Sequence, residues 1–242
     1  GDLDAAPSLR RLAGLGQRVL HLAPPPGQGV HDPRTQALLR ALQRGPRPRQ
    51  LVYGSTTGVY GDCAGAWVSE ERAVAPRTPR AQRRVHAERS LRAWGRGGTR
   101  VAILRIPGIY APNREGGTPE ARLRRGTPVL RPEDDVFTNH IHADDLARAC
   151  VRALWCATAQ RVYHVSDASA LRMGDYFDLA ADLYGLPRPS RVSWEEAQAQ
   201  LPSTLLSFMG ESRRLHTRRL ARELRLRLAY PTVVQGLQSV KN

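Results

Sequence analysis

Short runs of apolar residues alternate along this chain with segments in which apolar residues recur every three or four positions. Continuous apolar runs occupy residues 18–23, 50–53, 101–106 and 161–165. Each run is short and lacks regular polar alternation, which is typical of strands buried on both faces of a parallel sheet. The pattern therefore predicts four buried strands.

Segments with helical spacing separate these strands. Thr78 followed by Pro79 is typical of an N-cap and a first helical residue, and it predicts a helix that continues to about Trp94. Asp144 or Asp145 is expected to cap another helix. Further helices are predicted over residues 33–42, 119–125 and 173–184, and from residue 193 onward.

The alternation of strands and helices defines the expected fold class. Parallel strands that are connected through helices form a sheet covered on both faces. The 242 residues are enough for one large α/β domain, or for one such domain with a small lobe. We therefore predict an α/β fold with a doubly wound, mostly parallel, Rossmann-like sheet.

The basic residues change the expected chemistry. Of the 37 lysine and arginine residues all but Lys241 are arginine, and the formal net charge is +15. Any mechanism that needs an internal lysine, such as a Schiff base, is therefore excluded. An arginine excess with much alanine, glycine and proline is what GC-rich coding produces, so the charge is weak evidence for nucleic-acid binding. We expect the arginine-rich segments 80–92 and 213–227 to be solvated faces, with anion or nucleic-acid binding as the alternative.

Cysteine spacing and hydropathy indicate the redox state and the cellular compartment of the protein. Cys63, Cys150 and Cys156 are odd in number and lack the spacing of a metal site, which indicates a reduced protein. No apolar run approaches the ~18 residues of a membrane span, and we recognise no signal peptide. We therefore predict a cytoplasmic protein without membrane contact.

Residues 51–61, with the sequence L-V-Y-G-S-T-T-G-V-Y-G, carry a recognisable pattern. They resemble the strand-end signature of the extended short-chain dehydrogenases/reductases, the NAD-dependent epimerases and dehydratases. Other segments resemble this family in the expected order over nearly the whole chain: G-D-L at 1–3, H-L-A at 21–23, L-R-I-P-G-I-Y-A-P at 104–112, N-H-I-H-A-D-D-L at 139–146 and V-Y-H-V-S-D at 162–167. Within the family, the chain is most similar to the small bacterial subgroup often labelled atypical.

The resemblance implies NAD(P) binding and epimerase or dehydratase redox chemistry on a small, nucleotide-sugar-like substrate. It implies a Rossmann-like domain at residues 1–167 and a C-terminal substrate lobe at residues 168–242, with an insert at 107–130 that contributes to the lobe. The choice between NAD and NADP stays open, as does the oligomeric state, a homodimer included.

The resemblance also implies roles for individual residues. The Asp2 carboxylate and the next backbone N–H meet the adenine ring, and Tyr110 lies near the nicotinamide or the substrate. The implied cofactor contacts together are Asp2, Leu3, Ala23, Pro24, Arg84 and Pro107.

The start of the sequence departs from the family. The family begins roughly fifty residues before its G-D-L, with a strand, a G-x-x-G-x-x-G turn and a helix whose N-terminus receives the pyrophosphate. This sequence begins at the G-D-L, so we expect a fragment, a truncated product or a mis-called start, with weak or absent cofactor binding. Gly54, Gly58 and Gly61 imitate a phosphate loop, but no helix is predicted directly after them, so we reject that interpretation.

A second departure concerns catalysis. Alignment of Thr78, Pro79 and Glu88 with the family's S-P-Y-x-x-x-K-x-x-x-E places Arg80 at the catalytic tyrosine and Arg84 at the lysine. A guanidinium stays protonated and has no acceptor, so it cannot act as a base near neutral pH. The usual proton relay is therefore absent, although Arg84 is still able to bond a ribose or phosphate.

Thr56 and Tyr60 are the remaining catalytic candidates. Thr56 matches the family residue that hydrogen-bonds the substrate oxygen, with satisfaction of the strand end as the alternative. Tyr60 replaces the missing phenol, or it packs structurally as in the family.

Three polar residues on predicted strands need partners. Arg105 lies on a buried strand, so we expect a carboxylate partner, with a substrate anion as the second interpretation. His140 and His142 share a strand face, but the resemblance gives His142 a structural role, and we predict no metal site.

Three functions remain open at this point. The first is an oxidoreductase whose proton relay uses Thr56 with water, or Tyr60. The second is a catalytically silent NAD(P)-binding sensor or scaffold. The third and least favoured is a basic protein that binds nucleic acid.

Overall fold

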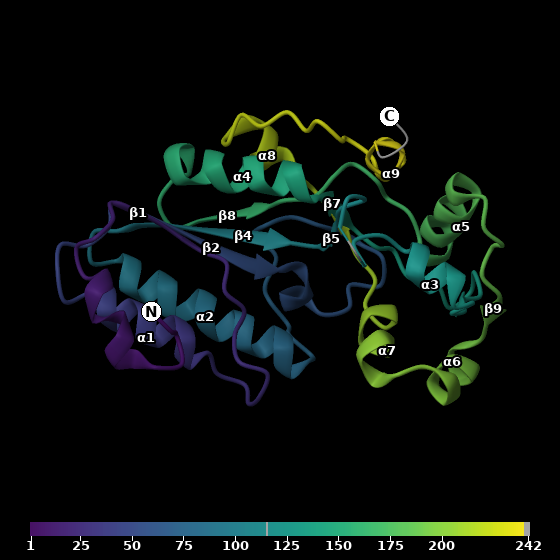
Figure 1. Cartoon of the computed structure of the whole chain (residues 1–242), viewed down its shortest axis with the longest axis horizontal. Coiled ribbons are helices and arrows are strands. Elements are labelled where there is room, and N and C mark those ends of the chain that lie inside the picture. The colour runs from purple at the N-terminus through teal and green to yellow at the C-terminus, as the bar shows by residue number, and fades with distance from the viewer. Residues whose placement is uncertain (115, 240–242) are drawn as a thin grey trace.

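The computed structural model describes residues 1–114 and 116–239. Its centre is a four-stranded parallel sheet with the strand order β1-β2-β4-β8 (Figure 1). These strands are β1 (Arg18–His21), β2 (Gln50–Thr56), β4 (Arg100–Ile106) and β8 (Arg161–His164). The short strands, which form the parallel pairs β3/β10, β5/β7 and β6/β9, are β3 (Trp67–Val68), β5 (Gly108–Tyr110), β6 (Val129–Leu130), β7 (His140–His142), β9 (Arg191–Val192) and β10 (Arg214–Leu215).

Helices cover both faces of the central sheet, as Figure 1 shows. The α-helices of the described residues are α1 (Pro33–Leu42), α2 (Pro79–Gly95), α3 (Glu120–Arg124), α4 (Ala143–Cys156), α5 (Met173–Tyr184), α6 (Trp194–Gln200), α7 (Ser203–Met209), α8 (Arg218–Arg222) and α9 (Val233–Gln238). Two 3₁₀ helices, η1 (Ala6–Leu12) and η2 (Thr57–Tyr60), precede β1 and follow β2. The predicted doubly wound, Rossmann-like α/β fold is therefore confirmed.

Two hydrophobic cores sandwich the central sheet. On one face Leu51 and Tyr53 of β2 pack with α1 and α2. On the other face Val52 packs with α4 and with Leu220 of α8. Successive β2 residues point to opposite faces and both faces are buried, which explains the continuous apolar runs of the sequence.

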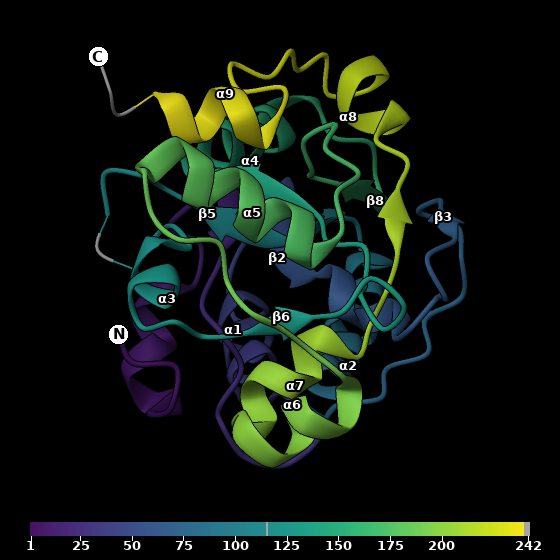
Figure 2. The ribbon, with the colours of Figure 1, turned by 90° about the vertical axis from the view of Figure 1, so that its right-hand side faces the viewer.

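A smaller lobe lies beyond the C-terminal ends of the strands. Its core joins residues of α3, α5, α6, α7 and α9 to β6. Figure 2 looks onto this lobe, with α3, α5, β6 and α7 in front of the strand ends. The predicted division near residue 167 remains a prediction. The packing adds that α8, which follows this point, lies against the sheet and not in the lobe.

Local capping signals fix several helix ends. The Thr78 hydroxyl accepts a hydrogen bond from the backbone N–H of Ala81 at 3.2 Å, which confirms the predicted start of α2. Ser193 and Glu196 form a reciprocal capping box, and Gly185 ends α5 in the left-handed region.

The predicted acidic cap of α4 is wrong. His142 is the N-cap, and its Nδ1 accepts from the backbone N–H of Asp144 at 3.2 Å. Asp145 is instead fully buried in the first turn, where it accepts from the backbone N–H groups of Ala229 and Tyr230 at 2.8 Å each. This carboxylate therefore attaches the C-terminal segment to α4.

Residues 1–114 and 116–239 contain neither a membrane-spanning helix nor a metal-binding cluster. No helix there combines the length and apolarity that a membrane crossing requires. No three histidine, cysteine or acidic side chains there gather in a way that would bind a metal ion.

Candidate functional site

A pocket of about 610 Å³ opens where the central strands end and the lobe begins. We call it the strand-end pocket. Ligands of open α/β sheets bind at the carboxyl ends of the strands, so this is the expected position for a functional site. Of the residues predicted from the sequence, Thr56, Arg84, Pro107 and Tyr110 line it.

Thr56 lies where β2 passes into η2. Its hydroxyl oxygen accepts from the backbone N–H of Gly58 at 3.3 Å, which satisfies the end of the strand. A hydroxyl has a further lone pair and one proton, and neither is used by a described residue. The side chain is half-buried and faces the pocket, so both sequence interpretations of Thr56 are compatible with its position.

Arg80 and Arg84 lie one helical turn apart on α2 and share the face that lines the pocket. Arg84 donates through Nη1 to the carbonyl of Gly54 at 2.7 Å and to the hydroxyl of Tyr53 at 3.0 Å. The Arg80 guanidinium stacks over the ring of Phe208 at 4.2 Å and has no hydrogen-bond partner among the described residues. Burial lowers the pKa of Arg80, although a guanidinium remains protonated at neutral pH.

Glu211 and Arg213 form the pocket wall opposite α2. Arg213 donates to the Glu211 carboxylate at 2.9 Å and to the carbonyl of Gly61 at 2.9 Å. Burial raises the pKa of Glu211. Because these two residues lie far along the chain from β2, the sequence patterns gave no sign that they belong to this site.

The predicted solvated face at residues 213–227 is wrong for two arginines. Arg213 is only 9% exposed. The Arg219 side chain is 12% exposed and donates to the Glu71 carboxylate and to the carbonyl of Val162. Both guanidinium groups are therefore committed to contacts within the protein.

Aromatic side chains form the lobe wall of the pocket. His140 stacks on Tyr176 with ring centroids 4.1 Å apart, and burial lowers the pKa of His140 to about 4. The ring is therefore neutral at pH 7, and its Nδ1 has no hydrogen-bond partner among the described residues. Arg122 stacks on Phe177 at 4.3 Å, and its buried Nε and Nη2 also lack partners within residues 1–114 and 116–239.

Tyr110 lies between the sheet and this lobe wall. Its ring meets the His142 ring edge-on at a centroid distance of 5.3 Å, and its hydroxyl points to the carbonyl of Thr232 at 3.5 Å. The side chain is 2% exposed, and burial raises its pKa. Tyr110 is therefore a neutral, packed wall residue of the pocket.

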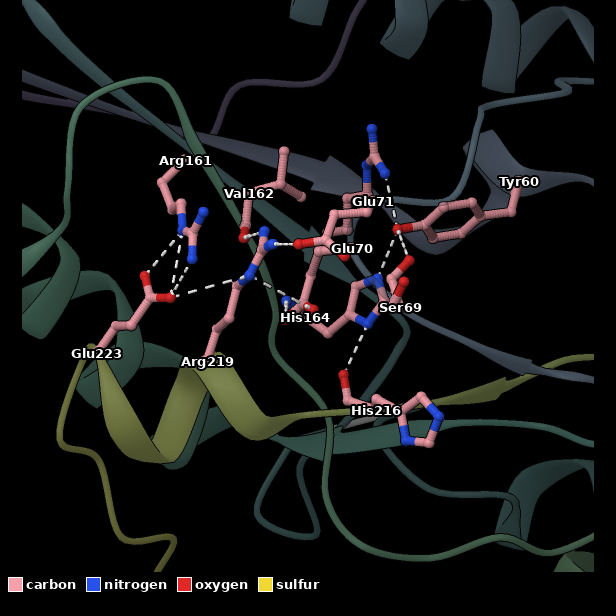
Figure 3. A network of polar contacts seen from close by, with 11 residues as sticks. Tyr60, Ser69, Glu70, Glu71, Arg161, Val162, His164, His216, Arg219 and Glu223 are labelled. Carbon is pink, nitrogen blue, oxygen red and sulfur yellow. Dashed lines mark hydrogen bonds and ion pairs between the residues drawn. The ribbon is translucent and has the colours of Figure 1, made fainter.

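Tyr60 lies outside the strand-end pocket. Its hydroxyl accepts from Nη1 of Arg105 at 2.7 Å and lies 2.5 Å from Nε2 of His164 (Figure 3). Since Nδ1 of His164 lies 2.9 Å from the carbonyl of His216, Nδ1 carries the ring proton and Nε2 accepts from Tyr60. Burial raises the pKa of Tyr60 to about 12 and lowers that of His164 to about 3. The phenol proton is therefore held inside the protein.

Arg105 has the carboxylate partner that the sequence predicted. Its guanidinium forms two hydrogen bonds with Glu88, at 2.7 and 3.2 Å, and the two side chains are 3% and 4% exposed. Glu88 also accepts from the hydroxyl of Ser55 at 2.6 Å. The ion pair and Tyr60 form one buried network, which Ser55 connects to the strand-end pocket. Arg105 and Glu88 also line a separate pocket with Glu70 and Arg219.

Asp2, Leu3, Ala23 and Pro24 do not line the strand-end pocket. Asp2 is exposed, and its Oδ1 accepts from the backbone N–H of Asp4 at 2.9 Å. Leu3 packs against the α1 side of the sheet, and Ala23 and Pro24 follow the end of β1. The neighbouring Leu22 does line the pocket, so the end of β1 reaches its rim.

Comparisons with known proteins identify relatives of this chain. The model of the NAD dependent epimerase/dehydratase family matches residues 34–166. A search of curated proteins finds no significant match.

Solved structures match over nearly the whole chain. A functionally unknown conserved protein from Silicibacter pomeroyi is 31% identical, with a TM-score of 0.80 over 93% of this chain and 77% of that one. RMD from Pseudomonas aeruginosa complexed with NADPH is 21% identical, with a TM-score of 0.78 over 99% and 85% of the two chains. A double mutant of DesIV, a dTDP-glucose 4,6-dehydratase from Streptomyces venezuelae with NAD and DAU bound, is 21% identical, with a TM-score of 0.78 over 100% and 77%.

The parallel sheet, the helices on both of its faces and the pocket at its strand ends define a Rossmann-like α/β protein. The family model covers more than half of the residues, and so the chain belongs to the NAD-dependent epimerase/dehydratase family. The family resemblance found in the sequence is confirmed.

Proposed function

We propose that the chain is an NAD(P)-dependent oxidoreductase of the epimerase/dehydratase type that acts on a nucleotide-sugar-like substrate in the strand-end pocket. The observation that carries this proposal is the meeting of Thr56, Pro107 and Tyr110 at the strand ends of a family member. Structural relatives complexed with NADPH, or with NAD and DAU, support the same kind of ligand.

Thr56 is the residue that we propose contacts the reacting oxygen. Its hydroxyl faces the pocket and would donate to a substrate oxygen, with water completing the proton path. Tyr60 is a weaker candidate because its proton is donated to His164. Tyr110 and Pro107 would form the wall beside the reacting carbon.

The described residues do not provide a complete cofactor site. When bound, NAD(P) supplies hydride transfer in this kind of chemistry. A pyrophosphate needs a glycine-rich turn that leads into an α-helix. Here β1 leads into three prolines and β2 leads into a 3₁₀ helix. We therefore expect these 242 residues to bind NADPH only weakly, so that saturation needs a high concentration, and calorimetric titration showing micromolar affinity would contradict this.

Turnover tests the proposal directly. Absorbance of the reduced nicotinamide is followed with saturating NAD(P) and a panel of nucleotide sugars. We expect slow turnover that Thr56→Val abolishes and that Thr56→Ser, which keeps the hydroxyl, retains. Equal turnover of Thr56→Val and the parent protein would contradict the role of Thr56.

A catalytically silent sensor or scaffold is the second candidate. It is favoured by Arg80 and Arg84, which stand where the family resemblance implies the tyrosine and lysine of the proton relay. Binding of NAD(P)H and a nucleotide sugar with no turnover of any substrate would support this candidate over the enzyme.

A further inference from the structure

The charge of the strand-end pocket is unbalanced. Four arginines and one carboxylate line it among the described residues, namely Arg80, Arg84, Arg122, Arg213 and Glu211. His140 adds no charge at pH 7, because burial lowers its pKa to about 4.

The single carboxylate is already used. Glu211 pairs with Arg213 at 2.9 Å. Arg80, Arg84 and Arg122 have no carboxylate partner within 4.0 Å in the described part of the chain. Arg84 and Arg122 are half-buried, and guanidinium groups in such partly enclosed sites normally have anionic partners, because unpaired charge and unused donors are costly there. Arg80 is exposed beside them. The missing partner is therefore a candidate ligand.

The first turns of α2 strengthen this imbalance. The helix carries no acidic residue in its first turn, and Arg80, Arg83 and Arg84 follow its N-cap. The positive end of the helix dipole and three cations thus lie together, an arrangement that an anion would stabilise. Arg80 has no hydrogen-bond partner in the described residues, and Arg84 uses only Nη1.

These observations converge on the corner beside Thr56, which α2 shares with the end of β2. We infer that the ligand of this pocket carries a carboxylate, which Arg80 and Arg84 hold beside Thr56. The inference rests on the proposed function only in taking this ligand to be the substrate. The two arginines would then bind and orient an acidic substrate at the position where the family resemblance implies a proton relay.

A small-anion test is independent of any nucleotide sugar. Melting temperatures are measured with malonate and with its neutral counterpart malonamide, at fixed ionic strength. The variants are Arg80→Gln and, as the matched control, Arg89→Gln, which removes an equal charge from the same helix at an exposed position that does not line the strand-end pocket. Because Arg80 has no hydrogen-bond partner among the described residues, Arg80→Gln should fold, and its melting temperature without ligand verifies this.

We expect saturating malonate to raise the melting temperature of the parent and of Arg89→Gln by about 2–4 °C, and that of Arg80→Gln by less than half as much. Malonamide should have no effect. An equal malonate response in all three proteins, or an equal response to malonamide, would overturn the inference.

A second titration connects the corner to the substrate. UDP-glucuronic acid and UDP-glucose differ by one carboxylate, so calorimetry with both isolates its contribution. We expect about tenfold tighter binding of the acid by the parent and by Arg89→Gln, and no preference in Arg80→Gln. Equal affinities in the parent would overturn the inference and leave the proposed function intact. If neither compound binds, the nucleotide-sugar proposal is wrong, and the malonate result still decides the inference.

Discussion

The buried pair of Arg105 and Glu88 offers a sharp test of what stabilises the central sheet. Arg105→Met removes both hydrogen bonds to Glu88 and the donor that reaches Tyr60 at 2.7 Å. Glu88 would keep only the Ser55 hydroxyl, at 2.6 Å, although its carboxylate lies in the buried interior. Breaking a buried ion pair in this way costs about 3–5 kcal/mol, a large part of the stability of a typical domain.

Urea denaturation measures this loss. The midpoint should fall with little change in slope, because the surface exposed on unfolding is nearly the same. Arg100→Met is the matched control, since Arg100 begins the same strand with an exposed side chain. The double variant Arg105→Met/Glu88→Leu should recover much of the loss, because no charge is left buried. A loss below about 1 kcal/mol in the single variant would refute the reasoning.

Two further predictions concern the buried side chains of Asp167 and Tyr60 and their effect on stability. Burial raises the pKa of Asp167 from 3.8 to about 7, so the folded protein binds this proton more tightly than the unfolded chain does. Stability should therefore fall as pH rises from about 4 to about 7, and Asp167→Asn should remove this fall and be more stable at pH 8 by about 2–4 kcal/mol. Thermal melts at pH 5 and at pH 8 measure it, and an equal fall with pH in both proteins would count against this assignment. Tyr60→Phe should lower stability by about 1–3 kcal/mol, because a nitrogen of Arg105 and Nε2 of His164 each lose a partner. Its affinity for UDP-glucose in calorimetry should match that of the parent, and a loss of affinity without a loss of stability would instead place Tyr60 in the site.

The sheet could be predicted because its signals are local. Continuous apolar runs identified all four central strands, and Thr78 with Pro79 identified the start of α2. Where a local signal competed with a distant partner, the prediction failed. Asp145 has the chemistry of a cap, but its carboxylate bonds to backbone groups of residues 229 and 230, which the sequence near α4 cannot indicate.

The pocket could be predicted only on its sheet side. Thr56 and Pro107 follow apolar strands, so their position at the strand ends follows from the fold. Phe208, Glu211 and Arg213 belong to short segments of the lobe that have no long periodic pattern. Only tertiary packing brings them opposite α2, and so the charge of the pocket became visible only in the structure.

Hydrogen exchange in the presence of UDP-glucose tests the central claim, that the strand-end pocket is a nucleotide-sugar site. We expect slower exchange of the backbone amides in Gly108–Tyr110 and Glu120–Arg124, the pocket walls contributed by β5 and α3. Saturating UDP-glucose that leaves these amides unchanged, or protects only the separate pocket lined by Glu70 and Arg219, would contradict the account.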